Sequence, residues 1–173
     1  MSYIHGADAA FAGNIPPGFD AAFGYYGGPE AYHVWSRADW QRFPGPKIPV
    51  WVGGYSGLDE GTQAVVALRA LDVPKGAVTV LDMETRVDKT YVHAFAGPLQ
   101  DAGYKVWVYG SASTVFGNPQ VNGYWVADYR GQPFMHPQVG VRATQYAADL
   151  PPGFDASLIK AWTAEFMWGG GLK

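Results

Sequence analysis

The sequence contains no cysteine, so disulfide bonds and thiolate-ligated metal sites are excluded. Charge is scarce as well: charged residues make up 16% of the 173 residues, and the net charge is −3. The basic residues are scattered along the chain, whereas a nucleic-acid-binding surface needs them concentrated to neutralise phosphates. We therefore expect no nucleic-acid partner.

The sequence also lacks a long hydrophobic run. No apolar stretch approaches the roughly 20 residues that a membrane-spanning helix needs. The N-terminal segment has neither the basic start nor the apolar core of a signal peptide. We expect no membrane insertion and no signal peptide, so work outside a cell would require another export route or a larger assembly.

Several catalytic and metal-binding motifs are missing. The four histidines have no metal-ligand spacing, and neither a Gly-x-Ser-x-Gly elbow nor a phosphate-binding loop occurs. We therefore expect neither a metal site nor a cofactor.

Apolar residues are plentiful, at 48% of the chain, and the length suits one domain with one core. Apolar runs of strand length recur between Gly and Pro residues. They predict eight strands, at residues 3–8, 21–27, 47–53, 78–84, 105–110, 123–129, 141–146 and 154–159. Helical spacing predicts helices at residues 30–43, 58–71 and 89–102.

Strands that alternate with helices favour parallel pairing, and the stretches "VTVLDMET" and "YKVWVYGS" read as buried parallel strands. After residue 110 the connections are loops rich in Gly, Pro and Asn. The pattern predicts an α/β fold, an irregular TIM-like β/α barrel of eight strands with helices mainly in the first half. An open α/β sheet and a truncated Rossmann-like domain remain alternatives, although the Gly-x-Gly-x-x-Gly signature of the latter is absent.

One segment is repeated in part: "IPPGFDAAF" at residues 15–23 and "LPPGFDASL" at residues 150–158. We interpret both as Pro-Gly turns that lead into a strand. In a closed barrel the second and the last strand both flank the first, so similar turns leading into these two strands are reasonable.

Two carboxylates end the apolar run "TVLDMET". Side chains at positions i and i+2 of a strand point to the same face, so Asp82 and Glu84 are expected to project together into a barrel mouth. Neighbouring carboxylates do not both ionise easily, and a carboxyl with a raised pKa is suited to general acid catalysis, as in glycoside hydrolysis. The alternative is a solvent-exposed strand end with solvated acids.

Other strands carry acids at their ends. Asp8 closes the first strand and Asp128 follows "GYWVA", while Asp155 begins the last strand and is equally well explained as a turn residue. The side chains near strand ends that we expect to bind a sugar are Tyr26, Tyr109, Tyr129, Tyr146 and Gln145. For Gln145, a hydrogen-bonded polar group inside the barrel is the alternative.

Taken together, the chain resembles glycoside hydrolase family 25 lysozymes and the related glycoside-hydrolase-like domains of actinobacteria and their phages. The similarity runs through "LDMET", "VWVYGS", "GYWVADY", "ATQYA" and "FDASLI", and so covers nearly the whole chain. The resemblance implies cleavage of the β-1,4 bond after N-acetylmuramic acid in peptidoglycan, without metal. We expect one barrel domain over residues 1–166, and the glycine-rich end "MWGGGLK" at residues 167–173 predicts a flexible tail.

By this resemblance, Glu84 is the general acid/base and Asp82 orients the N-acetyl group or stabilises positive charge. Asp8 and Asp128 then line the catalytic cleft. The chain departs from the family after Asp8, where Ala-Ala replaces Val-Ser, and in its short first connection. A non-catalytic glycan-binding or structural module of a phage particle or cell envelope is therefore the second hypothesis.

Overall fold

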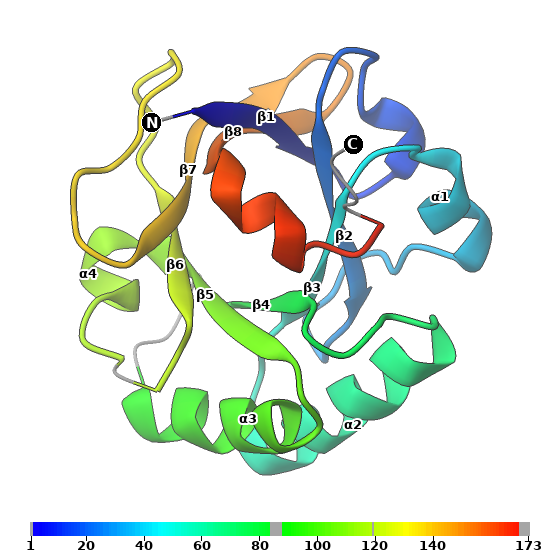
Figure 1. Ribbon diagram of the computed structural model, residues 1–173, viewed down its shortest axis with the longest axis vertical. Helices are drawn as coiled ribbons and strands as arrows, with labels where there is room; N and C mark the ends of the chain where they lie inside the picture. The colour runs from blue at the N-terminus through cyan, green and yellow to red at the C-terminus, as the bar shows by residue number, and fades with distance from the viewer. Residues whose placement is uncertain (1, 84–87, 119, 170–173) are drawn as a thin grey trace.

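Eight strands form a closed barrel in chain order in the computed structural model, which describes residues 2–83, 88–118 and 120–169 (Figure 1). This confirms the predicted α/β barrel. The strands are β1 (Tyr3–Asp8), β2 (Ala21–Gly27), β3 (Lys47–Val52), β4 (Val78–Asp82), β5 (Lys105–Ser111), β6 (Gly123–Ala127), β7 (Val141–Leu150) and β8 (Phe154–Lys160).

The last strand runs against the others. β1 to β7 pair in parallel, whereas β8 is antiparallel to both β7 and β1. Only residues 151–153 connect β7 to β8, and a parallel pairing needs a crossover of a dozen or more residues. The reversal brings the start of β8 beside the end of β1, where Asp155 is the register partner of Asp8.

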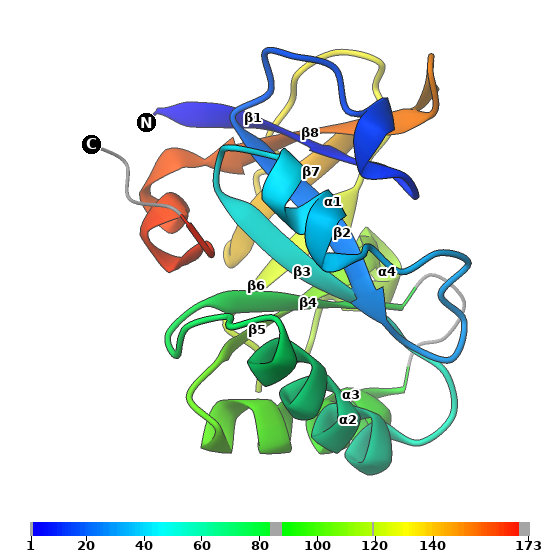
Figure 2. The same cartoon turned by 90° about the vertical axis from the view of Figure 1, so that its right-hand side faces the viewer.

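The predicted second and third helices are present within a residue of their expected bounds, as α2 (Gly57–Ala70) and α3 (Lys89–Asp101). They pack side by side along the β4 and β5 side of the barrel (Figure 2). In the described part of the later connections, the one α-helical segment is the single turn α4 (Ala112–Val115). Short 3-10 turns form η1 (Ala12–Asn14) before β2 and η2 (Ala161–Phe166) after β8. Among the described residues, no helix combines the length and apolar character required to cross a membrane.

The predicted helix at residues 30–43 is wrong over its first half, because only α1 (Arg37–Arg42) forms. Trp35 accounts for the difference: its side chain is buried, and its indole N–H donates to the Ala9 carbonyl at 3.0 Å. The backbone N–H of Trp35 donates to the Tyr25 carbonyl at 2.8 Å, which ties this segment to β2. Trp35 lies so close to Gly24 that an added Cβ there would come within 2.5 Å of the indole.

The C-terminal segment packs across the centre of the barrel (Figure 1). Met167 is buried in the same apolar cluster as the barrel interior. Trp168 pairs with Lys47 through two backbone hydrogen bonds, of 2.8 and 3.0 Å. The packed chain therefore extends at least to Trp168, beyond the expected start of a flexible tail at residue 167.

The two repeated Pro-Pro-Gly-Phe turns feed β2 and β8, and both strands flank β1 as the sequence suggested. The turns also contact each other. The rings of Phe19 and Phe154 lie 5.3 Å apart in an edge-on arrangement, and Asn14 Nδ2 donates to the Gly153 carbonyl at 3.4 Å. The repeat thus contributes to one apolar cluster on the outer face of the barrel.

Alternation along the strands decides which side chains reach the barrel interior. In β4, Val78 and Val80 belong to the interior cluster, and Asp82 continues the same row to the carboxyl end of the strand. In β5, Trp107 and Tyr109 belong to the same interior cluster, and Tyr109 is the partner of Asp82 in the register of the two strands. Interior rows of apolar side chains therefore finish in polar groups at one end of the barrel.

Glu60, in the first turn of α2, is a buried carboxylate that joins this helix to its neighbours. It accepts hydrogen bonds from Tyr91 Oη at 2.5 Å and Trp51 Nε1 at 3.2 Å, and from the backbone N–H groups of residues 54–56 at 2.7 to 3.1 Å. Burial alone would raise the pKa of Glu60, but the hydrogen bonds, led by that from Tyr91, outweigh it and lower the pKa.

We expect Glu60→Gln to reduce the free energy of unfolding by at least about 2 kcal/mol at pH 7, because an amide nitrogen would face buried donors. Since the pKa of Glu60 is lowered on folding, its contribution is present above the unfolded-state pKa and is lost as the pH falls through the folded-state value. Urea unfolding should therefore show that the difference in free energy of unfolding between wild type and Glu60→Gln becomes smaller below about pH 4. The neighbouring Asp59→Asn is the control and should cost less than about 1 kcal/mol. Equal losses for the two variants would contradict this role of Glu60.

Candidate active site

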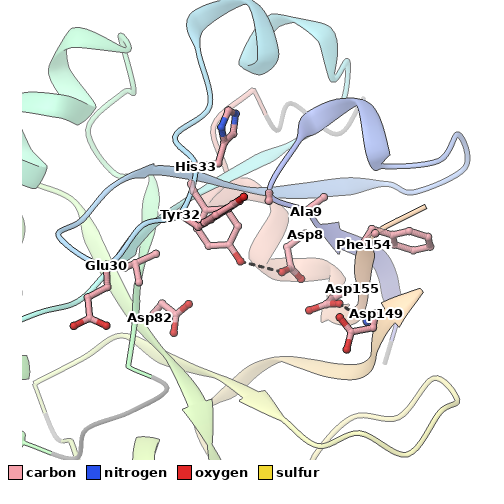
Figure 3. Close-up of a pocket in the computed structure, with 13 residues that line it drawn as sticks. Asp8, Ala9, Glu30, Tyr32, His33, Asp82, Asp149, Phe154 and Asp155 are labelled. Atoms are coloured by element: carbon pink, nitrogen blue, oxygen red, sulfur yellow. Dashed lines mark hydrogen bonds between the residues drawn. The ribbon is translucent and has the colours of Figure 1, made fainter. Parts of the chain in front are cut away.

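A pocket of about 380 Å³ opens at the carboxyl end of the parallel strands. Such barrels place their active sites at this end. Figure 3 shows acidic side chains from separate segments around this hollow, and aromatic side chains beside them. The acids are Asp8, Glu30, Asp82, Asp149 and Asp155, and the rings are Tyr25, Tyr32, His33 and Phe154.

Asp8 is the most buried acid of this pocket, with 4% of its surface exposed. It ends the interior row of β1 and accepts a hydrogen bond from Tyr25 Oη at 3.3 Å. Burial raises the pKa of Asp8 well above its usual range, and the negative charges of Asp155 and Asp82 raise it further. Asp8 is thus a buried carboxyl of raised pKa, a property that suits an acid catalyst.

Asp82 lies at the end of β4, is 8% exposed and lines the pocket, as the sequence predicts. Its negative charge raises the pKa of Asp8. The predicted partner Glu84 lies outside the described residues, so its position relative to Asp82 stays a prediction.

Gln145, in β7, is 1% exposed, and its side-chain amide bonds four partners. The Nε2 group donates to Asp8 Oδ1 at 3.2 Å and to Asp155 Oδ2 at 2.8 Å. The Oε1 atom accepts from Tyr109 Oη and, at 3.0 Å, from Tyr129 Oη. The two phenol oxygens lie 3.1 Å apart. Gln145 thus has the expected place beside the site, with its polar atoms turned to protein groups.

Asp155 is the site residue that the sequence indicated least clearly. It begins β8, lines the pocket, and accepts from the backbone N–H of Asp149 at 2.7 Å as well as from Gln145. Asp149 adopts the left-handed backbone region, with φ of 55°, which is uncommon for a residue with a side chain. The hairpin between β7 and β8 therefore holds Asp155 through a strained backbone position.

Asp128 is not among the described residues that line the pocket. Its carboxylate forms a two-pronged ion pair with Arg130, at 3.1 Å for both bonds, and its backbone N–H donates to the Gln145 carbonyl. The sequence places Asp128 at a strand end correctly, but its carboxylate is engaged by the loop that follows β6.

The predicted sugar-binding tyrosines separate into two groups. Tyr109 and Tyr129 lie in the Gln145 network, and Tyr129 is 57% exposed at the mouth. Tyr26 is buried outside the barrel interior, where its hydroxyl bonds Thr79 Oγ1 at 3.0 Å. Tyr146 lies in the apolar cluster on the outer face.

Alternation along β2 explains the position of Tyr26: Phe23 and Tyr25 face the interior cluster, so Tyr26 faces outward. Tyr25, its neighbour in β2, lines the pocket and donates a hydrogen bond to Asp8. Burial is the main cause of a strongly raised pKa of Tyr109, so this phenol remains a donor. Among the described residues, no group of three or more His, Asp or Glu side chains is placed to hold a metal ion.

No protein-family model matches the chain, and neither does any curated protein. Solved structures are similar in fold. An uncharacterised protein of B. stearothermophilus superposes with a TM-score of 0.77 at 19% identity, over 95% of this chain and 100% of that one. The muramidase of Acremonium alcalophilum gives a TM-score of 0.61 at 11% identity, over 91% and 93% of the two chains.

The modular autolysin LytC of Streptococcus pneumoniae gives a TM-score of 0.69 at 15% identity, over 91% of this chain but 47% of that one. LytC has also been solved with a synthetic peptidoglycan ligand. These likenesses establish that the chain has a lysozyme-like barrel fold.

We expect Asp8→Asn to change how stability depends on pH. A carboxyl whose pKa is raised on folding contributes stability that is complete below the unfolded-state pKa and is lost as the pH rises through the folded-state pKa. Asp8→Asn carries no such group, so its stability relative to wild type should increase with pH, by about 1.4 kcal/mol for each unit by which folding raises the pKa.

Urea unfolding of both proteins between pH 4 and 9 measures this difference. Asp72→Asn is the control, because the ion pair of Asp72 with Arg37 is largely exposed. Its free energy of unfolding should not show the gain over wild type with rising pH that is expected of Asp8→Asn. A constant difference for Asp8→Asn would contradict the raised pKa of Asp8.

Proposed function

We propose that this protein is a glycosidase of the lysozyme type, an N-acetylmuramidase that hydrolyses β-1,4 bonds of peptidoglycan by carboxylate acid/base catalysis. The observation that carries the proposal is the convergence of Asp8, Asp82 and Asp155 on one pocket at the mouth of a lysozyme-like barrel. Glycoside hydrolysis requires carboxyl groups in different protonation states, and the pocket combines a carboxyl of raised pKa with further acids.

In this proposal Glu84 is the general acid/base, since it follows Asp82 by two residues in the motif "LDMET". Asp82 stabilises positive charge at the reacting sugar carbon or orients the N-acetyl group. Burial raises the pKa of Asp8, which favours less negative charge next to Asp82. Tyr25 and Tyr32 offer ring surfaces on which a sugar can stack.

The size of the pocket fits this role, because about 380 Å³ is within the range of small-ligand sites. The structural neighbours include a muramidase and the autolysin LytC, which has been solved with a synthetic peptidoglycan ligand, and they support the choice of peptidoglycan among glycans. Such a substrate lies outside the cytoplasm, so the proposal includes export or delivery by a larger particle.

One observation favours a second candidate, a non-catalytic glycan-binding module. Both oxygens of Asp155 and both oxygens of Asp8 accept hydrogen bonds from protein groups. Carboxyls held in this way can shape a binding pocket without taking part in bond cleavage.

Release of reducing ends from purified peptidoglycan distinguishes the two candidates. We expect wild type to release them and Glu84→Gln to lower the rate by about 10²–10⁴-fold, because the proton donor is lost. The control Asp72→Asn removes an exposed carboxylate elsewhere and should keep the wild-type rate.

Co-sedimentation with the same walls supplies the second measurement. Binding of wild type without release across several wall types would favour the binding module. If wild type shows no binding and no release, both candidates are refuted. Unchanged release by Glu84→Gln would show that Glu84 is not the general acid/base.

A further inference from the structure

We infer that Gln145 is a positioning residue, which fixes the placement of Asp8 relative to Asp155 and does not itself contact the substrate. The inference rests on the proposed function for its catalytic consequence, while its structural part can be tested without turnover. It replaces the sequence-based expectation that Gln145 binds the sugar.

The bonding capacity of the Gln145 amide is already used inside the protein. A primary amide has two N–H donors and an oxygen that accepts two hydrogen bonds. The two donors serve Asp8 and Asp155, and the oxygen accepts from Tyr109 and Tyr129. With 1% of its surface exposed, Gln145 has no unused hydrogen-bonding group and no surface that a ligand could reach.

These partners also determine the orientation of the amide. A flipped Gln145 would turn Oε1 toward carboxyl oxygens and leave the Tyr109 and Tyr129 hydroxyls facing its N–H groups. The observed orientation places donors against acceptors at all four contacts. The partners come from β1, β5, β8 and the loop after β6, so one side chain links four segments.

Asp155 is the anchored end of this arrangement, because the backbone N–H of Asp149 holds its second oxygen at 2.7 Å. Gln145 then transmits that position to Asp8 through bonds of 2.8 and 3.2 Å. Without the amide, the negative charge of Asp155, which raises the pKa of Asp8, would face Asp8 with no donor between the two carboxyls.

The experiment follows the Asp8 carboxyl by carbon-13 NMR during a pH titration, in wild type, Gln145→Leu and the matched control Thr144→Val. The hydrogen bond from Gln145 lowers the pKa of Asp8, so Gln145→Leu should raise that pKa further. Thr144 is the adjacent buried residue, and its hydroxyl accepts from the His136 backbone N–H at 2.9 Å, away from the acids. Thr144→Val should leave the Asp8 titration unchanged.

Tyr129→Phe is the second variant, because Tyr129 is exposed and its loss should not prevent folding. It removes one of the two donors to Gln145 Oε1, so the pKa of Asp8 should shift in the same direction by a smaller amount. If Gln145→Leu does not fold, this variant decides the question. An Asp8 titration identical to wild type in every folded variant would overturn the inference.

Kinetics on peptidoglycan complete the test. We expect Gln145→Leu to lower kcat about 10²-fold while KM stays within about twofold, because a misplaced acid impairs the transition state more than binding. A shifted Asp8 titration in a protein whose wild type cleaves no wall would support the positioning role and refute the proposed reaction. A raised KM with unchanged kcat and an unchanged titration would instead return Gln145 to substrate binding.

Discussion

The mouth of this barrel depends on a buried primary amide that must satisfy donors on one side and acceptors on the other. Gln145 accepts from two phenols and donates to two carboxyls, and each contact crosses to a different segment of the chain. A buried polar group without partners is expensive, so all of these segments must approach together for the amide to be stable there. The placement of Asp8 and Asp155 follows from that requirement.

The direction of β8 is the second constraint, and it originates in the length of a loop. A connection of residues 151–153 cannot carry the chain back to the other end of the barrel, so β8 must return antiparallel. An acid at the start of β8 therefore meets an acid at the end of β1, as the register of Asp8 with Asp155 shows. In an all-parallel barrel the same Asp155 would lie at the opposite end, far from the pocket.

These two constraints explain which parts of the site could be predicted from the sequence. Alternation within a strand is local, and it correctly placed Asp8 and Asp82 at the mouth. The register that sets Asp155 beside Asp8 depends on pairing between strands, which a single sequence does not display. For the same reason the helix at residues 30–43 was overestimated, since burial of Trp35 against a distant carbonyl outweighs local helical spacing.

Asp8 and Glu60 show why burial alone does not identify a functional acid. Asp8 and Glu60 are 4% and 5% exposed as residues, yet folding raises the pKa of Asp8 and lowers that of Glu60. Glu60 is surrounded by donors that join β3, α2 and α3, so its charge is stabilised and its role is structural. Asp8 receives fewer donors and faces like charges in an open pocket. A fold that retains such a destabilised acid where ligands can enter gives up stability at that position, which is the pattern expected of a functional site.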